Sequence, residues 1–299
     1  MLDWYAHHAR DLPWRRADAT PWGILVSEVM LQQTPVGRVL EPWSAWLAHW
    51  PTPASLAAAP SGAAVAAWGR LGYPRRALRL HHAAVSITER HGGVVPRTYE
   101  ELRTLPGIGD YTAAAVATFA YGARHAVVDT NVRRVLARVA GGRADDAPSA
   151  QSRRLAASYV PDADRAPRWA VAAMELGAVV CTARSPRCED CPVSDLCAWR
   201  AAGSPELAQP VRRPQPWHGT DRQCRGALLR AVRDGPGRMP RRRLLAVWPD
   251  PVQAGRCLAA LVAEGLLHGE GTVSLYERCA ERRFGEHSAT QDEQFSTAS

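Results

Sequence analysis

The chain has 299 residues, of which 46% are hydrophobic and 22% charged, with a formal net charge of +8. This length suits one large domain or two moderate ones with a buried core. No apolar run approaches the roughly 18 residues of a membrane span, so an integral membrane protein is excluded. The N-terminal residues lack a signal-peptide pattern, which predicts a cytoplasmic protein. The positive charge favours a polyanionic partner.

All 37 basic residues are arginine, and the chain contains no lysine. No side-chain amine is therefore available to form a Schiff base with a substrate. Any lyase chemistry that depends on a lysine is excluded.

A short helix is predicted from Leu2 to Trp14. The next helix is predicted from Ile24 to Pro35; it is apolar nearly all round, which indicates deep burial. Glu28 lies in its middle. Because burying an isolated charge is costly, this carboxyl group must be paired, open to a cavity or protonated. A structural salt bridge to an arginine is the alternative to a functional role.

Further helices are predicted at 42–50 and 61–71, and Tyr73 follows at a turn. The stretch 105–112 then reads Leu-Pro-Gly-Ile-Gly-Asp-Tyr-Thr. Gly107 and Gly109 flank Ile108, which suits a tight turn with positive φ before a helix begins at Asp110. A helix N-terminus offers free N–H groups to a phosphate. We therefore expect the hairpin around Leu105, Gly107 and Gly109 to bind a nucleic-acid backbone.

Asp129 begins a second amphipathic helix, whose apolar residues recur at helical spacing from Val132 to Val139. Aspartate is common at the N-cap of a helix, so an ordinary cap is the alternative to a catalytic role.

Four of the seven cysteines are clustered, separated by six, two and five residues: Cys181, Cys188, Cys191 and Cys197. Such a compact set predicts a metal site, either zinc or an iron–sulfur cluster, and not a disulfide framework. Arg184 and Arg187, between the first two cysteines, can reach phosphates or can form a solvated basic loop.

Helices are predicted at about 149–160 and 166–180. A proline-rich linker follows from Pro205 to Pro216. Beyond it, the pattern indicates three helices and a short β-wing at 269–276, an order that resembles a winged-helix module. The last residues are polar and predicted to be disordered.

Three of these motifs point to one family. A Gly-x-Gly hairpin followed about twenty residues later by an aspartate that begins a helix resembles the helix-hairpin-helix DNA glycosylases. The sequence Ser-Glu-Val-Met-Leu-Gln-Gln-Thr at 27–34 matches the signature of the adenine glycosylase (MutY) branch. The cysteine spacing resembles the [4Fe-4S] motif of the endonuclease III and adenine glycosylase branch.

The resemblance implies an all-α, helix-hairpin-helix glycosylase fold with a C-terminal winged-helix-like module. The implied domains are a six-helix barrel domain at 22–122, an iron–sulfur cluster domain at 1–21 and 123–211, a module at 212–280 and a tail at 281–299.

It further implies a monofunctional enzyme that flips out and excises adenine opposite 8-oxoguanine or guanine, acting as a monomer on double-stranded DNA in the bacterial nucleoid. Glu28 is the implied general acid and Asp129 the group that stabilises the sugar, with Tyr111 and Asn131 orienting them. The implied DNA contacts are Arg15, Gln32, Gln33, Thr34 and Tyr73, and the cofactor is a [4Fe-4S] cluster.

Two alternatives stay open. Tyr111 occupies the position where bifunctional relatives carry a lysine, and both adenine and thymine mismatch glycosylases accept tyrosine there. The residues after 216 show no Nudix-like strand pattern, and Pro74 replaces an aromatic residue of relatives. A thymine or uracil mismatch glycosylase is one alternative; the other is a non-catalytic, cluster-bearing DNA-binding protein.

Overall fold

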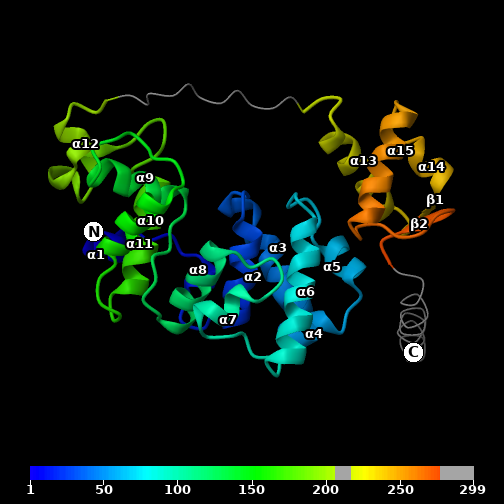
Figure 1. Cartoon of the computed structure of the whole chain (residues 1–299), viewed down its shortest axis with the longest axis horizontal. Coiled ribbons are helices and arrows are strands. Elements are labelled where there is room, and N and C mark those ends of the chain that lie inside the picture. Colours follow the sequence, from blue (N-terminus) through cyan, green and yellow to red (C-terminus); the bar gives the residue numbers. More distant parts are fainter. Residues whose placement is uncertain (206–216, 277–299) are drawn as a thin grey trace, which may run out of the picture. The chain divides into compact units, whose positions relative to one another are not determined.

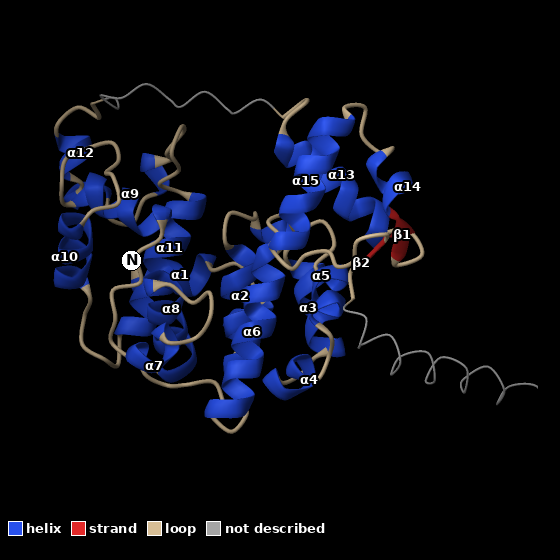
Figure 2. Cartoon of the chain, turned by 45° about the vertical axis from the view of Figure 1, so that its right-hand side comes forward, coloured by secondary structure: helices blue, strands red, loops and turns tan. Residues whose placement is uncertain are grey.

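A computed structural model describes residues 1–205 and 217–276. Most of the predicted linker and the whole predicted tail at 281–299 lie outside the described residues. The described chain is helical apart from one short pair of strands (Figure 2), which confirms the all-α prediction. Contacts divide the chain into two units, Met1–Gln33 with Val94–Arg212 and Thr34–Gly93 with Arg213–Ser299. The predicted domain boundaries rest on motifs and stay predictions.

The first unit contains most of the motifs found in the sequence. Its helices are labelled in Figure 1. The helix predicted at 2–14 is shorter than expected, because the backbone already becomes extended at Ala9. The elements are α1 Leu2–His8, a 3₁₀ turn Pro13–Arg15, α2 Pro21–Leu31, α7 Tyr99–Arg103, α8 Asp110–Tyr121, α9 Thr130–Val139, α10 Ala150–Tyr159, α11 Ala166–Val179, 3₁₀ turns Cys188–Asp190 and Ser194–Leu196, and α12 Ala198–Ala201.

Helix α2 is buried along most of its length, as its apolar sequence predicts. The Thr20 side chain caps it by accepting a hydrogen bond from the Gly23 N–H at 3.0 Å, and Pro21 suits its first turn. Every residue from Trp22 to Met30 is buried, and α2 packs against α8. The alanine-rich sequence of α8 lets the two helices approach closely. Glu28 is therefore held inside the unit.

The helix-hairpin-helix turn joins α7 to α8, which begins at Asp110 as predicted. Gly107 has φ +78°, whereas Gly109 has an ordinary φ of −91°. The turn therefore requires positive φ at Gly107 alone. Ile108 is buried, and Arg103 secures the turn by donating to the Ile108 carbonyl at 2.9 Å and pairing with Asp110 at 2.8 Å.

Helix α11 packs against α9, and both are drawn in green in Figure 1. A Cβ atom at Gly177 would lie 2.7 Å from the Asn131 Cβ atom, closer than side chains tolerate. Glycine at 177 is therefore needed to bring α11 against the first turn of α9.

The second unit begins with a 3₁₀ turn Val36–Arg38 and four helices, α3 Leu40–His49, α4 Pro53–Ala57, α5 Ser61–Ala67 and α6 Arg75–Arg90. Its core contains the fully buried Trp46 and Trp68, whose rings meet edge to face at 5.6 Å.

The C-terminal module comprises α13 Asp221–Arg233, β1 Arg238–Pro240, α14 Arg241–Leu245, α15 Pro251–Ala263 and β2 Thr272–Ser274. Strands β1 and β2 are antiparallel, with Met239 opposite Val273. The three predicted helices are present, but β1 was not predicted. Helix α15 ends at Ala263, shortly before Gly265, whose φ of +70° is typical of a helix C-terminus.

No helix within residues 1–205 and 217–276 combines the length and apolar character that a membrane span needs.

Candidate active site

Four side chains of the first unit interact around a buried carboxyl group: Glu28, Tyr111, Asp129 and Arg15. Glu28 is 6% exposed and is hydrogen-bonded by the Tyr111 hydroxyl. The pKa of Glu28 is raised to about 7, mainly by burial and in smaller part by the negative charge of Asp129. The Tyr111 hydrogen bond and the charge of Arg15 oppose this rise. Glu28 can therefore hold a proton near neutral pH.

The alternative predicted for Glu28, a structural salt bridge, is not present among the described residues. The nearby guanidinium of Arg15 instead donates to Glu175 at 2.8 Å. Glu175 is fully buried, and Arg10 donates to it as well. Burial alone would raise the pKa of Glu175, but the bonds from the two arginines hold it below its ordinary value. Arg15 is thereby fixed close to Glu28 without pairing with it.

Asp129 is the N-cap of α9, which the sequence analysis gave as the alternative to a catalytic role. One carboxylate oxygen accepts from the Val132 N–H at 2.7 Å, and the other accepts from the Asn131 side chain at 2.7 Å. Burial raises the pKa of Asp129, and these hydrogen bonds together with Arg134 oppose the rise. The cap does not exclude a catalytic role, because the same carboxylate acts electrostatically on Glu28 and Tyr111. Capping holds the charge in place.

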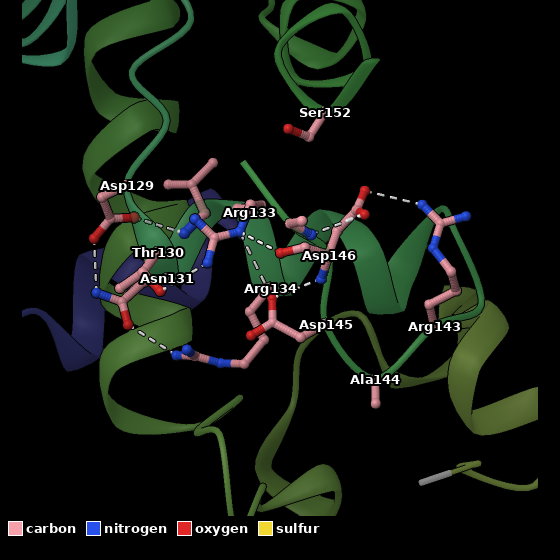
Figure 3. Close-up of polar contacts among 12 residues, drawn as sticks. Asp129, Thr130, Asn131, Arg133, Arg134, Arg143, Ala144, Asp145, Asp146 and Ser152 are labelled. Atoms are coloured by element: carbon pink, nitrogen blue, oxygen red, sulfur yellow. Dashed lines mark hydrogen bonds and ion pairs between the residues drawn. The ribbon is translucent and has the colours of Figure 1, made fainter. Parts of the chain in front are cut away.

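Sequence reasoning missed Arg134. Its guanidinium is buried and donates to the Asn131 side-chain oxygen at 2.8 Å, the Gly177 carbonyl at 2.7 Å and the Cys181 carbonyl at 2.8 Å. Figure 3 shows Asp129, Asn131 and Arg134 joined in a line by hydrogen bonds. An arginine three residues after Asn131 on the buried side of α9 is the signal that could have identified it. Arg134 links Asp129 to the first clustered cysteine.

For the base excision that the sequence resemblance implies, we expect Arg134→Gln to lower the rate by about ten- to hundred-fold, because Arg134 positions Asp129 through Asn131 and small displacements of reacting groups are costly. Arg133→Gln is the matched control, since Arg133 donates to the Asp146 carbonyl at 2.6 Å and not to Asn131 (Figure 3). Single-turnover assays measure both variants. Equal rates for the two would show that the Arg134 bonds do not position Asp129.

The sequence resemblance implies that Glu28 is the general acid of base excision, a role that requires its protonated form, and we therefore expect excision to slow as the pH rises through about 7. Tyr111→Phe removes a hydrogen bond that lowers the pKa of Glu28. The alkaline limb of its rate profile should therefore move to higher pH, whatever the change in maximal rate. Single-turnover rates from about pH 5.5 to about pH 9 test this. A limb that moves to lower pH would contradict the assigned role of Tyr111.

The predicted DNA-contacting residues are held differently in the two units. In the first unit, Gln32 donates to the Thr112 hydroxyl at 3.3 Å and Leu105 is buried. Gln33, at the end of that unit, has a positive φ of 55°. In the second, the buried Thr34 hydroxyl bonds to the Leu71 carbonyl at 3.3 Å, whereas Tyr73 is 45% exposed.

The two arginines of the cysteine segment, Arg184 and Arg187, are both exposed. Arg187 donates to the Val179 carbonyl at 2.7 Å and lies 3.6 Å from Asp190. Both side chains are therefore accessible to a phosphate.

The four clustered cysteines are free thiols that line one cavity at the end of the first unit. Buried Arg138 donates to the Cys181 sulfur at 3.3 Å and lies over the Trp199 ring at 4.6 Å. No three His, Cys, Asp or Glu side chains in the described part of the chain are placed to hold a single metal ion. Four thiols around one cavity, with a guanidinium to balance thiolate charge, fit an iron–sulfur cluster in donor number and chemistry.

The comparisons with known proteins agree with this arrangement. Residues 26–161 match the model of the HhH-GPD superfamily base excision DNA repair protein, and 181–197 match the iron–sulfur binding domain of endonuclease III. The chain is similar in structure to a thermostable thymine-DNA glycosylase, with a TM-score of 0.62 and 29% identity over 67% of this chain and 93% of that one. An endonuclease III–DNA complex gives a TM-score of 0.58 and 25% identity, covering 68% and 94%. Fold and site thus define a helix-hairpin-helix base excision repair protein with a [4Fe-4S] cluster.

Similar sequences identify the family within this class of repair proteins. The chain is 53% identical to the adenine DNA glycosylase of Mycolicibacterium smegmatis, over 89% of this chain and 91% of that protein. The thymine-DNA glycosylase of Aeropyrum pernix is 35% identical, over 67% and 92%. The chain belongs to the adenine DNA glycosylase family.

Proposed function

We propose that this chain excises adenine mispaired with 8-oxoguanine or guanine in duplex DNA, by hydrolysis of the N-glycosidic bond. The main support for the proposal is that two carboxyl groups lie near Tyr111: Glu28, which can hold a proton, and Asp129, which is fixed by hydrogen bonds. Family membership supports adenine as the base.

The target nucleotide must first leave the base stack, which costs a few kcal/mol. In this proposal the hairpin from Leu105 to Asp110 binds the phosphate backbone, because the α8 N-terminus offers unpaired N–H groups. Gln32 and Tyr73 fill or support the gap that the extruded base leaves. Arg15 contacts the extruded base.

Two carboxyl groups then divide the chemistry, as they do in glycoside hydrolysis. Glu28 transfers its proton to N7 of adenine as the C1′–N9 bond breaks, and the bonding electron pair stays on the base. The Asp129 carboxylate stabilises the positive charge at C1′. Water adds to C1′, and its proton returns to Glu28. Tyr111 and Asn131 hold the two carboxyl groups in place, and the reaction ends at the free base because no lysine is available.

We propose Cys181, Cys188, Cys191 and Cys197 as the cluster ligands. A cluster held by these four residues would crosslink the segment 181–197, and hydrolysis needs no redox step. This segment directs Arg184 and Arg187 toward DNA phosphates. Arg138 and Arg134 bond to the sulfur and the carbonyl of Cys181 and so connect the segment to α9.

The 35% identity to a thymine-DNA glycosylase makes thymine opposite guanine the second candidate substrate. The test incubates the protein with duplexes that carry adenine opposite 8-oxoguanine, adenine opposite guanine or thymine opposite guanine, followed by alkali. Strand breaks at the first two duplexes are expected. Breaks confined to the third would replace adenine with thymine as the substrate, and no breaks at all would favour a non-catalytic DNA-binding protein.

A further inference from the structure

The loop between α5 and α6 holds an exposed aromatic ring on a strained backbone. Tyr73 has φ +49° and follows Gly72 at φ +80°. A bulky residue with positive φ is energetically unfavourable and persists only where surrounding contacts impose it. The Tyr73 side chain is nevertheless 45% exposed. The contacts that hold this loop are therefore informative about its role.

Arg76 of α6 holds the loop from within the helical part of the second unit. Its buried guanidinium donates to the carbonyls of Leu71 at 3.1 Å and Gly72 at 3.0 Å. It also lies over the Trp68 ring at 5.2 Å and the Tyr73 ring at 5.6 Å. The Trp68 indole adds a bond to the Gly72 carbonyl at 2.9 Å. These contacts fix the backbone but cover only part of the Tyr73 ring.

The C-terminal module supplies the second cation. Arg222, in the first turn of α13, lies 5.0 Å from the Tyr73 ring and 5.4 Å from the ring of Trp217. Trp217 is itself 46% exposed. Tyr73 is thus contacted by two guanidinium groups, one from each part of the second unit.

Other contacts attach the module to the same loop. Arg233 donates to the Gly69 carbonyl, and Glu264 of the module pairs with Arg75 at 3.3 Å. A Cβ atom at Gly62 of α5 would overlap the Leu275 carbonyl oxygen, so the two backbones touch there. The module therefore braces both ends of the loop, and not Tyr73 alone.

We propose that Arg222 is a positioning residue for Tyr73, and that the C-terminal module acts by bracing the DNA-contacting loop 69–75. An exposed aromatic ring flanked by arginines suits stacking against nucleobases, and a braced ring loses less entropy on binding. The inference rests on the proposed function, since it assigns Tyr73 to the DNA surface. In this inference the C-terminal module contributes to lesion binding through Tyr73, without a pocket of its own for 8-oxoguanine.

The test compares Arg222→Gln with Arg230→Gln, an exposed arginine on the same helix. Affinity is measured for a duplex carrying a non-hydrolysable 2′-fluoro adenine nucleotide opposite 8-oxoguanine. Arg222→Gln should bind about three- to ten-fold more weakly than the wild type, and Arg222→Lys should recover part of the loss. The pH profile of excision should not move. Equal affinities for Arg222→Gln and Arg230→Gln would overturn the inference.

A double-mutant cycle with Tyr73→Ala identifies the route of the effect. If Arg222 acts through Tyr73, Arg222→Gln has no further effect once the ring is absent. Additive losses would overturn the inference, because Arg222 would then contact DNA independently. If the wild-type protein does not excise adenine, the proposed function is wrong. If the wild type excises adenine but Arg222→Gln binds the duplex as tightly as the wild type, only this inference is wrong. Should Arg222→Gln fail to fold, Glu264→Gln tests the same brace through Arg75.

Discussion

Glu28→Gln is expected to abolish adenine excision while leaving mismatch binding intact. Glutamine matches the shape of the carboxylic acid and can still accept the Tyr111 hydrogen bond, but it has no acidic proton for the leaving base. Loss of a general acid costs about 10²-fold to 10⁴-fold in rate. The fold should be retained, because the substitution replaces a buried titratable group with a neutral one. Single-turnover excision and equilibrium binding measure the two effects separately.

Glu41→Gln is the control for this variant, since Glu41 is exposed in α3. It should match the wild type in both assays. If Glu28→Gln excises adenine at the wild-type rate, Glu28 is not the general acid.

Asp129→Asn is expected to give the second large loss, about 10²-fold to 10³-fold, as for the removal of one group that stabilises developing charge. Asparagine also caps helices, so the bond from the Val132 N–H can be kept and α9 should remain folded. The negative charge that raises the pKa of Glu28 disappears. The alkaline limb of the residual activity should therefore move to lower pH, opposite to the effect of Tyr111→Phe.

Asp250→Asn tests whether such a loss reflects only a change of cap. Asp250 caps α15 through the N–H groups of Val252 and Gln253, and it has no role in the proposed chemistry. Its excision rate should equal that of the wild type. If Asp129→Asn also excises adenine at that rate, Asp129 is a cap and nothing more.

Much of the fold could be predicted from local sequence patterns. The apolar run around Glu28 predicted a buried helix, and α2 is buried. The start of α8 at Asp110 followed from the glycine pair, although only Gly107 requires its special backbone. Strand β1 was missed because Arg238–Pro240 is three residues long and ends in proline, which carries no periodic signal.

The partners of charged groups could not be predicted in the same way. Glu175 is paired with Arg10 and Arg15 across more than 150 residues of sequence, and Arg134 reaches Cys181 over 47. Arg222 and Tyr73 are also far apart along the chain. The position of Arg134 on the buried side of α9 is a local signal, but nothing in a local window distinguishes Arg10, Arg15 and Arg222 from the other arginines among the 37 of the chain.

The sequence by itself determined the chemical groups available: two carboxyl groups at helix positions typical of a glycosylase, four clustered thiols, a Gly-Ile-Gly hairpin before a helix and no lysine. Those properties depend on residue type and short-range spacing. Only the tertiary structure decided how each group behaves. Burial raises the pKa of Glu28 to about 7, bonds from Asn131 and Val132 hold Asp129 in place, and Arg222 braces Tyr73. Desolvation and long-range hydrogen bonds exist only once distant segments have packed together.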